Sequence, residues 1–161
     1  MFPYERCGRS ACVEPAPALV QHIQKHLNLN RVTERVKLYP VALGAVDGEG
    51  ELLLASEMLG NRLASAEDSA DRLPKVKVPI WSFSRLLETL GWDAVDVAKI
   101  DCEGCEYGLF SATPEDVLKR VKVWFVEVHG PVGAVAERLR SLGYEVEYDL
   151  YWREMYNLRA W

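Results

Sequence analysis

The stretch VDVAKIDCEGCEYGLF, residues 95–110, decides the fold of this chain. Apolar residues with β-branched side chains dominate its first six positions, which is typical of a buried strand. Asp101 ends this run, and Glu103 follows within a turn that contains glycine. A hydrophobic strand therefore delivers carboxylates to its own C-terminal end. Ligands of open parallel α/β sheets bind at that edge. The alternative is a solvated acidic turn without a function.

Composition indicates one domain spanning residues 1–161, which is long enough to bury a core. The apolar share of 49% is ordinary for a globular protein. The net charge of −5 argues against nucleic acid as a partner, because phosphate binding requires a basic surface. No apolar run has membrane-spanning length, and residues 1–6 lack the apolar region of a signal peptide. We therefore expect no membrane partner and a cytoplasmic location.

Strands and helices are predicted to alternate along the chain, which favours an α/β fold. The predicted strands cover residues 10–13, 36–43, 76–80, 95–100, 121–128, 144–150 and 155–161. The predicted helices cover residues 18–29, 114–119 and 132–142, and a further helix begins at Ser82 or Ser84 and ends at Gly91. Pro79 suggests an edge position for its strand. The polar segment 57–74 is predicted to be a mobile loop beside the site.

Residues 99–106, KIDCEGCE, resemble the K-I-D-V-E-G-A-E signature of the FkbM family of S-adenosylmethionine-dependent methyltransferases. Four further pieces match the family in order: EPAP at 14–17 resembles E-P-N-P, VALG at 41–44 with DG at 47–48 resembles V-A-L-G…D-G, VEVHG at 126–130 resembles L-E-V-H-G, and GY at 143–144 opens the last hairpin. The resemblance therefore covers nearly the whole chain.

The resemblance implies a Rossmann-like methyltransferase sheet, mainly parallel, with a C-terminal antiparallel hairpin. It also implies S-adenosylmethionine as the cofactor and a hydroxyl of a small molecule or sugar as the methyl acceptor, with an amine as a less favoured one. A different class of function stays open, in which a truncated methyltransferase-like domain retains the fold and serves in binding or assembly. A small zinc or thiol protein is a third class.

The resemblance assigns four residues to the cofactor: Glu14, Ala42, Asp101 and Glu103. Glu14 occupies the ribose-binding position of the family, where a carboxylate accepts hydrogen bonds from both ribose hydroxyls. The alternative for Glu14 is a surface carboxylate that the dipole of the following helix favours.

Asp101, Glu127 and His129 are the candidate catalytic residues. Glu127 and His129 are two apart on a strand and therefore project to the same side. Histidine ordinarily titrates near neutral pH, so His129 can remove a proton from the acceptor while a carboxylate holds its tautomer. Asp101 is the other candidate base. These groups could instead only satisfy one another at the strand ends. A divalent cation on Asp101, Glu103 and Glu127 is conceivable, but we expect no metal.

The four cysteines do not suggest a disulfide framework. Cys102 and Cys105 form a C-x-x-C pattern, which elsewhere indicates redox activity or zinc. The family has valine and alanine at these positions, so we interpret both as free, small apolar residues. A zinc site built from Cys7, Cys12, His22 and His26 is an alternative with unusual spacing.

The family pattern also predicts a first strand and a glycine-rich turn, D-V-G-A-N-x-G, before the position of Glu14. Only Gly8 is found in the thirteen residues that precede it, so the chain is expected to lack the first strand and first helix. That strand would lie between the strands that end near Glu14 and Asp101. Three outcomes are open: these two strands pair directly, a second copy fills the gap, or the natural protein starts upstream. We predict a homodimer, because unpaired edges are usually covered.

Overall fold

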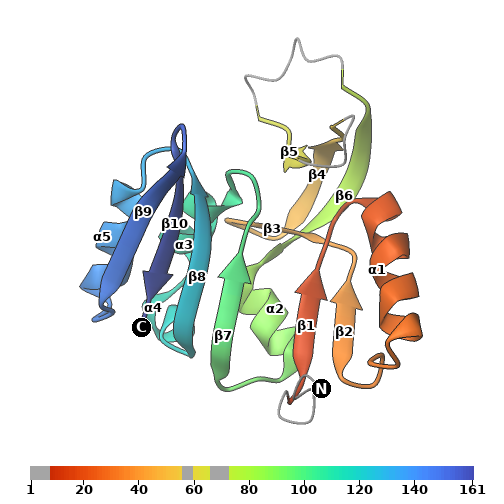
Figure 1. Cartoon of the computed structure of the whole chain (residues 1–161), viewed down its shortest axis with the longest axis horizontal. Helices are drawn as coiled ribbons and strands as arrows, with labels where there is room; N and C mark the ends of the chain where they lie inside the picture. Colours follow the sequence, from red (N-terminus) through yellow and green to blue (C-terminus); the bar gives the residue numbers. More distant parts are fainter. Residues whose placement is uncertain (1–7, 56–59, 66–72) are drawn as a thin grey trace. The chain divides into compact units, whose positions relative to one another are not determined.

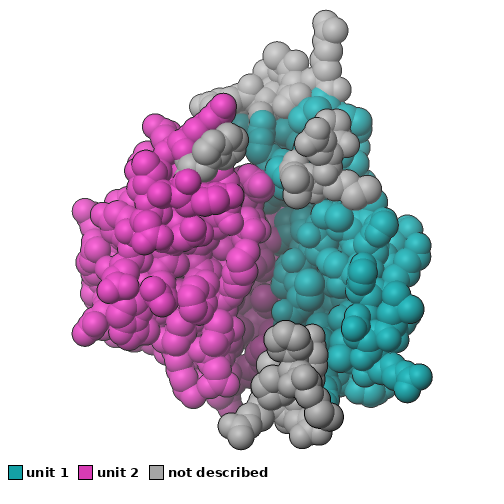
Figure 2. Space-filling model, in the orientation of Figure 1, with its two compact units in different colours: residues 1–42, 49–79 teal, residues 43–48, 80–161 magenta. Residues whose placement is uncertain are grey.

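Figure 1 shows a computed structural model of the chain, in which residues 8–55, 60–65 and 73–161 are described. These residues form five helices and ten strands, which confirms the α/β class. The chain divides into two compact units, Met1–Ala42 with Glu49–Pro79 and Leu43–Gly48 with Ile80–Trp161, coloured separately in Figure 2. Within the described ranges, no helix is both long and apolar enough to cross a membrane. The single domain stays a prediction.

The first unit begins with the predicted strand, helix and strand. Strands β1 (Ser10–Val13) and β2 (Val36–Tyr39) are parallel neighbours. Helix α1 (Pro17–Leu29) connects them and starts at a proline, whose missing N–H needs no partner in the first turn. The predicted strand over 36–43 is interrupted after Tyr39, and β3 (Ala42–Gly44) starts separately. Pro40 explains the break, because it has no N–H to donate.

A second sheet has the order β3-β6-β4-β5 and contains β4 (Gly48–Leu53), β5 (Arg62–Leu63) and β6 (Lys75–Ser82). The edge position suggested by Pro79 is wrong, because β6 has neighbours on both sides. The strand tolerates the proline because only one of its eight residues lacks an N–H donor. Strand β5 falls inside the predicted loop 57–74 and pairs with β4. Residues 57–59 and 66–72 of that loop lie outside the described residues.

The sheet of the second unit has the order β7-β8-β10-β9. Strands β7 (Val95–Ile100) and β8 (Val121–His129) run parallel. Strands β9 (Val146–Trp152) and β10 (Met155–Ala160) form the predicted antiparallel hairpin, and β10 pairs with β8. The described strands thus make three sheets, so a single, mainly parallel Rossmann-like sheet stays a prediction.

Helices of the second unit pack apolar side chains against this sheet. Trp124 of β8 is fully buried and contacts Phe110 and Phe83, with ring centroids 5.0 and 5.4 Å away. These phenylalanines come from α3 (Cys105–Ala112) and α2 (Phe83–Leu90), and the unit also contains α4 (Glu115–Leu118) and α5 (Gly133–Ser141). Of the two candidate caps, Ser82 is the one whose Oγ accepts a hydrogen bond from the Arg85 N–H.

The sequence analysis missed helix α3 altogether. Its sequence, CEYGLFSA, has a glycine in the middle and no clear apolar stripe, so helical periodicity is weak. Gly108 lies against the Ala45 segment, since a Cβ there would be 3.4 Å from the Ala45 side chain, at the edge of ordinary contact. Close packing explains the glycine of the VALG motif, because a Cβ at Gly44 would clash with Ile80 at 2.7 Å.

Strand β7 is less buried than its composition predicts. Ile100 is buried, but Val97 is 56% exposed. Among the described strands, β7 pairs with β8 alone and ends its sheet. Strand β1 pairs with β2 alone in the same part of the chain. Direct pairing of these two strands, one of the three outcomes left open, is therefore absent from the described residues.

We predict that the isolated chain forms a homodimer through such an unpaired edge, because apolar strand edges tend to pair with another chain. Light scattering at micromolar concentration should give twice the 18.2 kDa mass of one chain. Val97→Lys should shift the protein to a monomer, because a charge on an edge strand opposes pairing. The matched control is Val46→Lys, at a 70% exposed valine outside the strands. A monomeric wild-type chain would contradict the prediction.

Candidate active site

Polar side chains gather where β7 and β8 end. The two strands are parallel and place Ile100 beside Val126, so their carboxyl ends meet at one edge. Asp101 follows β7 directly. Glu127 and His129 are the last two residues of β8 that lie on its less buried side. The structure therefore brings together all three residues that were predicted to be catalytic.

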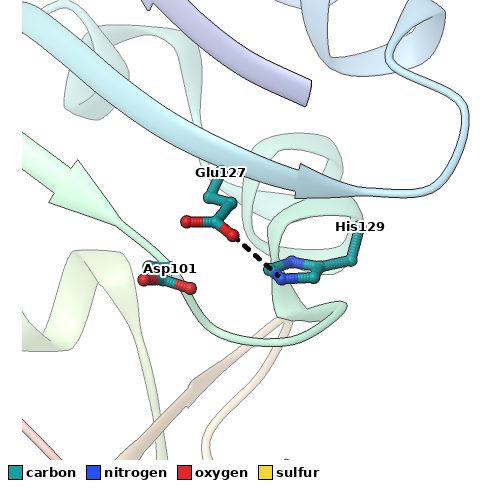
Figure 3. A group of neighbouring side chains, drawn as sticks. All are labelled: Asp101, Glu127 and His129. Carbon is teal, nitrogen blue, oxygen red and sulfur yellow. Dashed lines mark ion pairs between the residues drawn. The ribbon is translucent and has the colours of Figure 1, made fainter. Parts of the chain in front are cut away.

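Figure 3 shows this group of Asp101, Glu127 and His129. Nε2 of His129 lies 3.8 Å from Oε1 of Glu127, which confirms that the two side chains project together. Each residue offers one ligand atom, and these atoms lie within 4.8 Å of one another. The group could therefore hold a metal ion, with a histidine in place of the Glu103 considered from the sequence. The mechanism proposed below needs no metal.

Lys99 and Glu103 complete the charged surroundings. Nζ of Lys99 lies 2.8 Å from Oδ2 of Asp101, on the exposed side of the group. Oε2 of Glu103 lies 3.3 Å from Nε2 of His129. Glu103 reaches the histidine from a backbone with a φ of 53°, which is unusual for a residue other than glycine. The turn between β7 and α3 therefore adds a second carboxylate beside the imidazole.

Glu106 is the residue that holds this arrangement in place, and the sequence analysis did not assign it a role. Its side chain is fully buried in the first turn of α3. Its Oε1 accepts a hydrogen bond from the backbone N–H of His129 at 2.7 Å and lies 3.3 Å from Nδ1 of the ring. Its Oε2 accepts from the N–H of Gly104 at 2.9 Å. One carboxylate thus joins the turn after β7 to the end of β8.

A signal for Glu106 was present in the sequence. It is the last residue of the KIDCEGCE motif, yet an acidic residue at a helix start is ordinarily explained by the helix dipole. Burial distinguishes the two explanations, because a buried carboxylate needs hydrogen-bond donors on both oxygens. A sequence does not show which helix start is buried.

The imidazole of His129 is oriented for proton transfer. An ionised Glu106 can only accept hydrogen bonds, so its contact with Nδ1 favours the tautomer that carries the proton on Nδ1. Nε2 then presents a lone pair. This nitrogen is buried and, within the described part of the chain, makes no hydrogen bond. Its nearest charged neighbours are Oε2 of Glu103 at 3.3 Å and Oε1 of Glu127 at 3.8 Å.

The segment after β8 is tied to α3 by Tyr107. Burial, helped by the charges of Glu106 and Glu154, raises the pKa of Tyr107. The hydroxyl therefore keeps its proton and donates it to the carbonyl of Pro131 at 3.2 Å. This bond fixes the chain that follows His129.

The expectation that Cys102 and Cys105 are free is wrong. They form a disulfide, with Cα atoms 5.4 Å apart. The cause is the tight turn into α3, which a pattern of residue types does not reveal. Cys12 is a free thiol on β1. Its pKa is raised mainly by burial and, to a smaller extent, by the negative charge of Glu14. Cys7, which the alternative zinc site needs, lies outside the described residues.

Glu14 and Ala42 belong to the other compact unit. Oε1 of Glu14 accepts a hydrogen bond from the N–H of Ala16 at 2.8 Å, ahead of the proline that starts α1. Burial raises the pKa of Glu14, and the bond to Ala16 partly opposes this rise. Ala42 is buried at the start of β3. Their predicted contacts with a cofactor stay predictions.

An α/β chain with convergent polar groups at the carboxyl ends of parallel strands has the general arrangement of a ligand-binding enzyme. Residues 1–146 match the methyltransferase FkbM domain. The chain belongs to this family, which confirms the resemblance found from its motifs. A solved structure, the METTL16 MTase domain, is similar with a TM-score of 0.46 and 16% identity. The similarity covers 94% of this chain and 49% of the other, so this chain spans about half its length. No curated protein matches.

We predict that Glu106→Ala lowers the free energy of unfolding by about 1–3 kcal/mol or more, because the N–H groups of Gly104 and His129 lose their acceptor. Urea denaturation would measure the change. The matched control is Glu137→Ala, at an exposed carboxylate of α5, which should leave the midpoint unchanged. Equal midpoints for wild type and Glu106→Ala would show that this carboxylate does not join the two strand ends.

Proposed function

We propose that this chain is a methyltransferase that uses S-adenosylmethionine and methylates a hydroxyl of a small molecule or sugar in the cytoplasm. The observation that carries the proposal is the group of Asp101, Glu127 and His129 at the carboxyl ends of β7 and β8 in a chain of the FkbM family. Bound S-adenosylmethionine supplies an activated methyl group on a sulfonium. The protein's task is to orient the acceptor and to remove its proton.

Glu14 has the chemistry to hold the ribose of this cofactor. One oxygen keeps its bond to the N–H of Ala16, and the other can accept from the ribose hydroxyls. The carboxylate is half-buried, and a charge-assisted hydrogen bond is strong where water is partly excluded. Ala42, Asp101 and Glu103 are proposed as further cofactor contacts on the strength of the family motifs.

Nε2 of His129 is the proposed base. The contact of Glu106 with Nδ1 favours the tautomer in which Nε2 carries no proton and can accept one. Glu127 and Asp101 stabilise the imidazolium that forms when the proton arrives, since both carboxylates lie beside the ring. Asp101 is the alternative base, because it is the most exposed member of the group.

The proposed acceptor fits a hollow of about 250 Å³ that Glu127 helps to line on the sheet of the second unit. Charged and amide side chains surround this hollow together with two aromatic rings: Lys99, Glu127, Glu147, Asp149, Asn157, Arg159, Phe125 and Tyr148. Donors and acceptors beside exposed ring faces suit a hydroxylated small molecule or a sugar. A mostly apolar lining with a few polar groups is usual for a small-molecule site.

The competing proposal is a domain that binds and assembles without catalysis, which the exposed edge at Val97 favours. Cofactor binding separates the two. Calorimetric titration with S-adenosylhomocysteine should give saturable binding for an enzyme, and its absence from a folded chain would favour assembly.

We predict that Glu14→Gln weakens the binding of S-adenosylhomocysteine by about 1–3 kcal/mol, the cost of a charge-assisted hydrogen bond. The same change should not lower stability at neutral pH. A folded pKa above the ordinary value of 4.5 means that protonation favours the fold. The stability that the protonated carboxyl adds to the folded state is present below pH 4.5 and is lost as pH rises through the folded pKa. Removing the charge therefore removes a penalty, while glutamine can still accept from Ala16.

Calorimetry and thermal melting at pH 7 together test this prediction. Glu34→Gln, at an exposed glutamate of the same unit, is the matched control and should change neither affinity nor melting temperature. Unchanged affinity with a lower melting temperature would assign Glu14 to the helix start alone.

We predict that His129→Gln, which removes the proposed base, lowers turnover by roughly 10²–10⁴ and leaves affinity for S-adenosylhomocysteine nearly unchanged. Asp101→Asn, which removes the alternative base, should lower turnover too, but it should also weaken the binding, because Asp101 is a proposed cofactor contact as well. The assay would follow labelled methyl transfer from the cofactor to a panel of hydroxylated compounds and sugars. His26→Gln, at a histidine on α1, is the control for loss of an imidazole. Full activity in both site variants, or loss of folding instead of turnover, would contradict the assignment.

A further inference from the structure

The Cys102–Cys105 disulfide encloses only Glu103 and Gly104. The stabilisation that a disulfide gives through the unfolded chain grows with the length of the loop it closes, so this bond contributes little in that way. Its position is more informative. Asp101 precedes it directly, and Glu103 lies inside it. The bond therefore acts on the geometry of the site.

The backbone inside the disulfide has two consecutive positive φ angles, 53° at Glu103 and 106° at Gly104. Such a conformation at a residue other than glycine persists only when its surroundings enforce it. Two links hold the turn here, the covalent bond between its ends and the hydrogen bond from the Gly104 N–H to Glu106. The consequence is the position of the Glu103 carboxylate, whose Oε2 lies 3.3 Å from Nε2 of His129.

Both cysteines are partly exposed, so a small reductant can reach them. The reduced state also has a place for its new hydrogen atoms. Sγ of Cys102 lies 3.3 Å from Oε2 of the buried Glu106, close enough for a thiol to donate to that oxygen. In the cytoplasm, where we propose that this chain acts, disulfides are usually transient and serve catalysis or redox sensing.

We propose that Cys102 and Cys105 form a reversible redox switch that is reduced by dithiols and controls the contact between Glu103 and His129. A thiolate of the dithiol attacks one sulfur, and the other cysteine leaves as a thiolate and takes a proton. The second thiolate of the reductant then attacks the mixed disulfide and releases the remaining cysteine. The protein gains two electrons and two protons, and the dithiol becomes a cyclic disulfide.

The test uses the full chain in mixtures of reduced and oxidised dithiothreitol, without any methylation substrate. Free thiols are alkylated and assigned by peptide mass, which separates Cys102 and Cys105 from the other two cysteines. Imidazole NMR signals are recorded in the same mixtures. We expect the two thiols to appear together and the His129 signals to shift in step and return on oxidation. The signals of His22 and His26, both on α1, should stay in place.

The variant C102S/C105S should show His129 signals near those of the reduced protein and no response to dithiothreitol. Three results would overturn the proposal: no release of these thiols under native conditions, release without a shift of the His129 signals, or loss of the folded far-ultraviolet spectrum on reduction. The last would make the bond a structural one, and it can be read from the wild-type chain even where the variant does not fold.

Discussion

The site depends on one buried carboxylate. Glu106 is fully enclosed at the start of α3, and its two oxygens take the N–H groups of Gly104 and His129. Enclosing a charge is costly unless donors replace the lost water. The turn after β7 and the end of β8 must therefore meet at Glu106. This requirement fixes the ring of His129 and leaves its Nε2 facing the neighbouring carboxylates.

The turn that this carboxylate stabilises is under further constraint from its disulfide. Glu103 has a positive φ, and its side chain lies beside the imidazole that Glu106 orients from the other side. His129 therefore lies between the buried carboxylate of Glu106 and the partly exposed carboxylate of Glu103. Burial restricts Glu106 more than Glu103. Glu106 gives the site its fixed geometry, whereas Glu103 can respond to the state of the disulfide.

The sequence predicted the parts of the fold that local patterns encode. The strand predicted over 121–128 corresponds to β8, the helix predicted over 18–29 corresponds to α1, and alternation over 144–150 indicated the final hairpin. The spacing of Glu127 and His129 placed them on one side of their strand. Helix α3 was not predicted, because its sequence has a glycine in the middle and no clear apolar stripe. The sequence analysis also missed the disulfide and the role of Glu106, since both depend on a turn whose shape is set by distant residues. Strand composition also does not reveal that, among the described strands, β7 pairs with β8 alone.

The central claim is that the residues which the FkbM motifs assign to the cofactor bind S-adenosylmethionine. The most direct measurement is the change in backbone amide NMR signals when S-adenosylhomocysteine is added to the full chain. We predict saturable shifts at residues 14–16 and 101–106 and unchanged signals at residues 146–152 of β9. Shifts confined to other residues, or none with the chain folded, would contradict it.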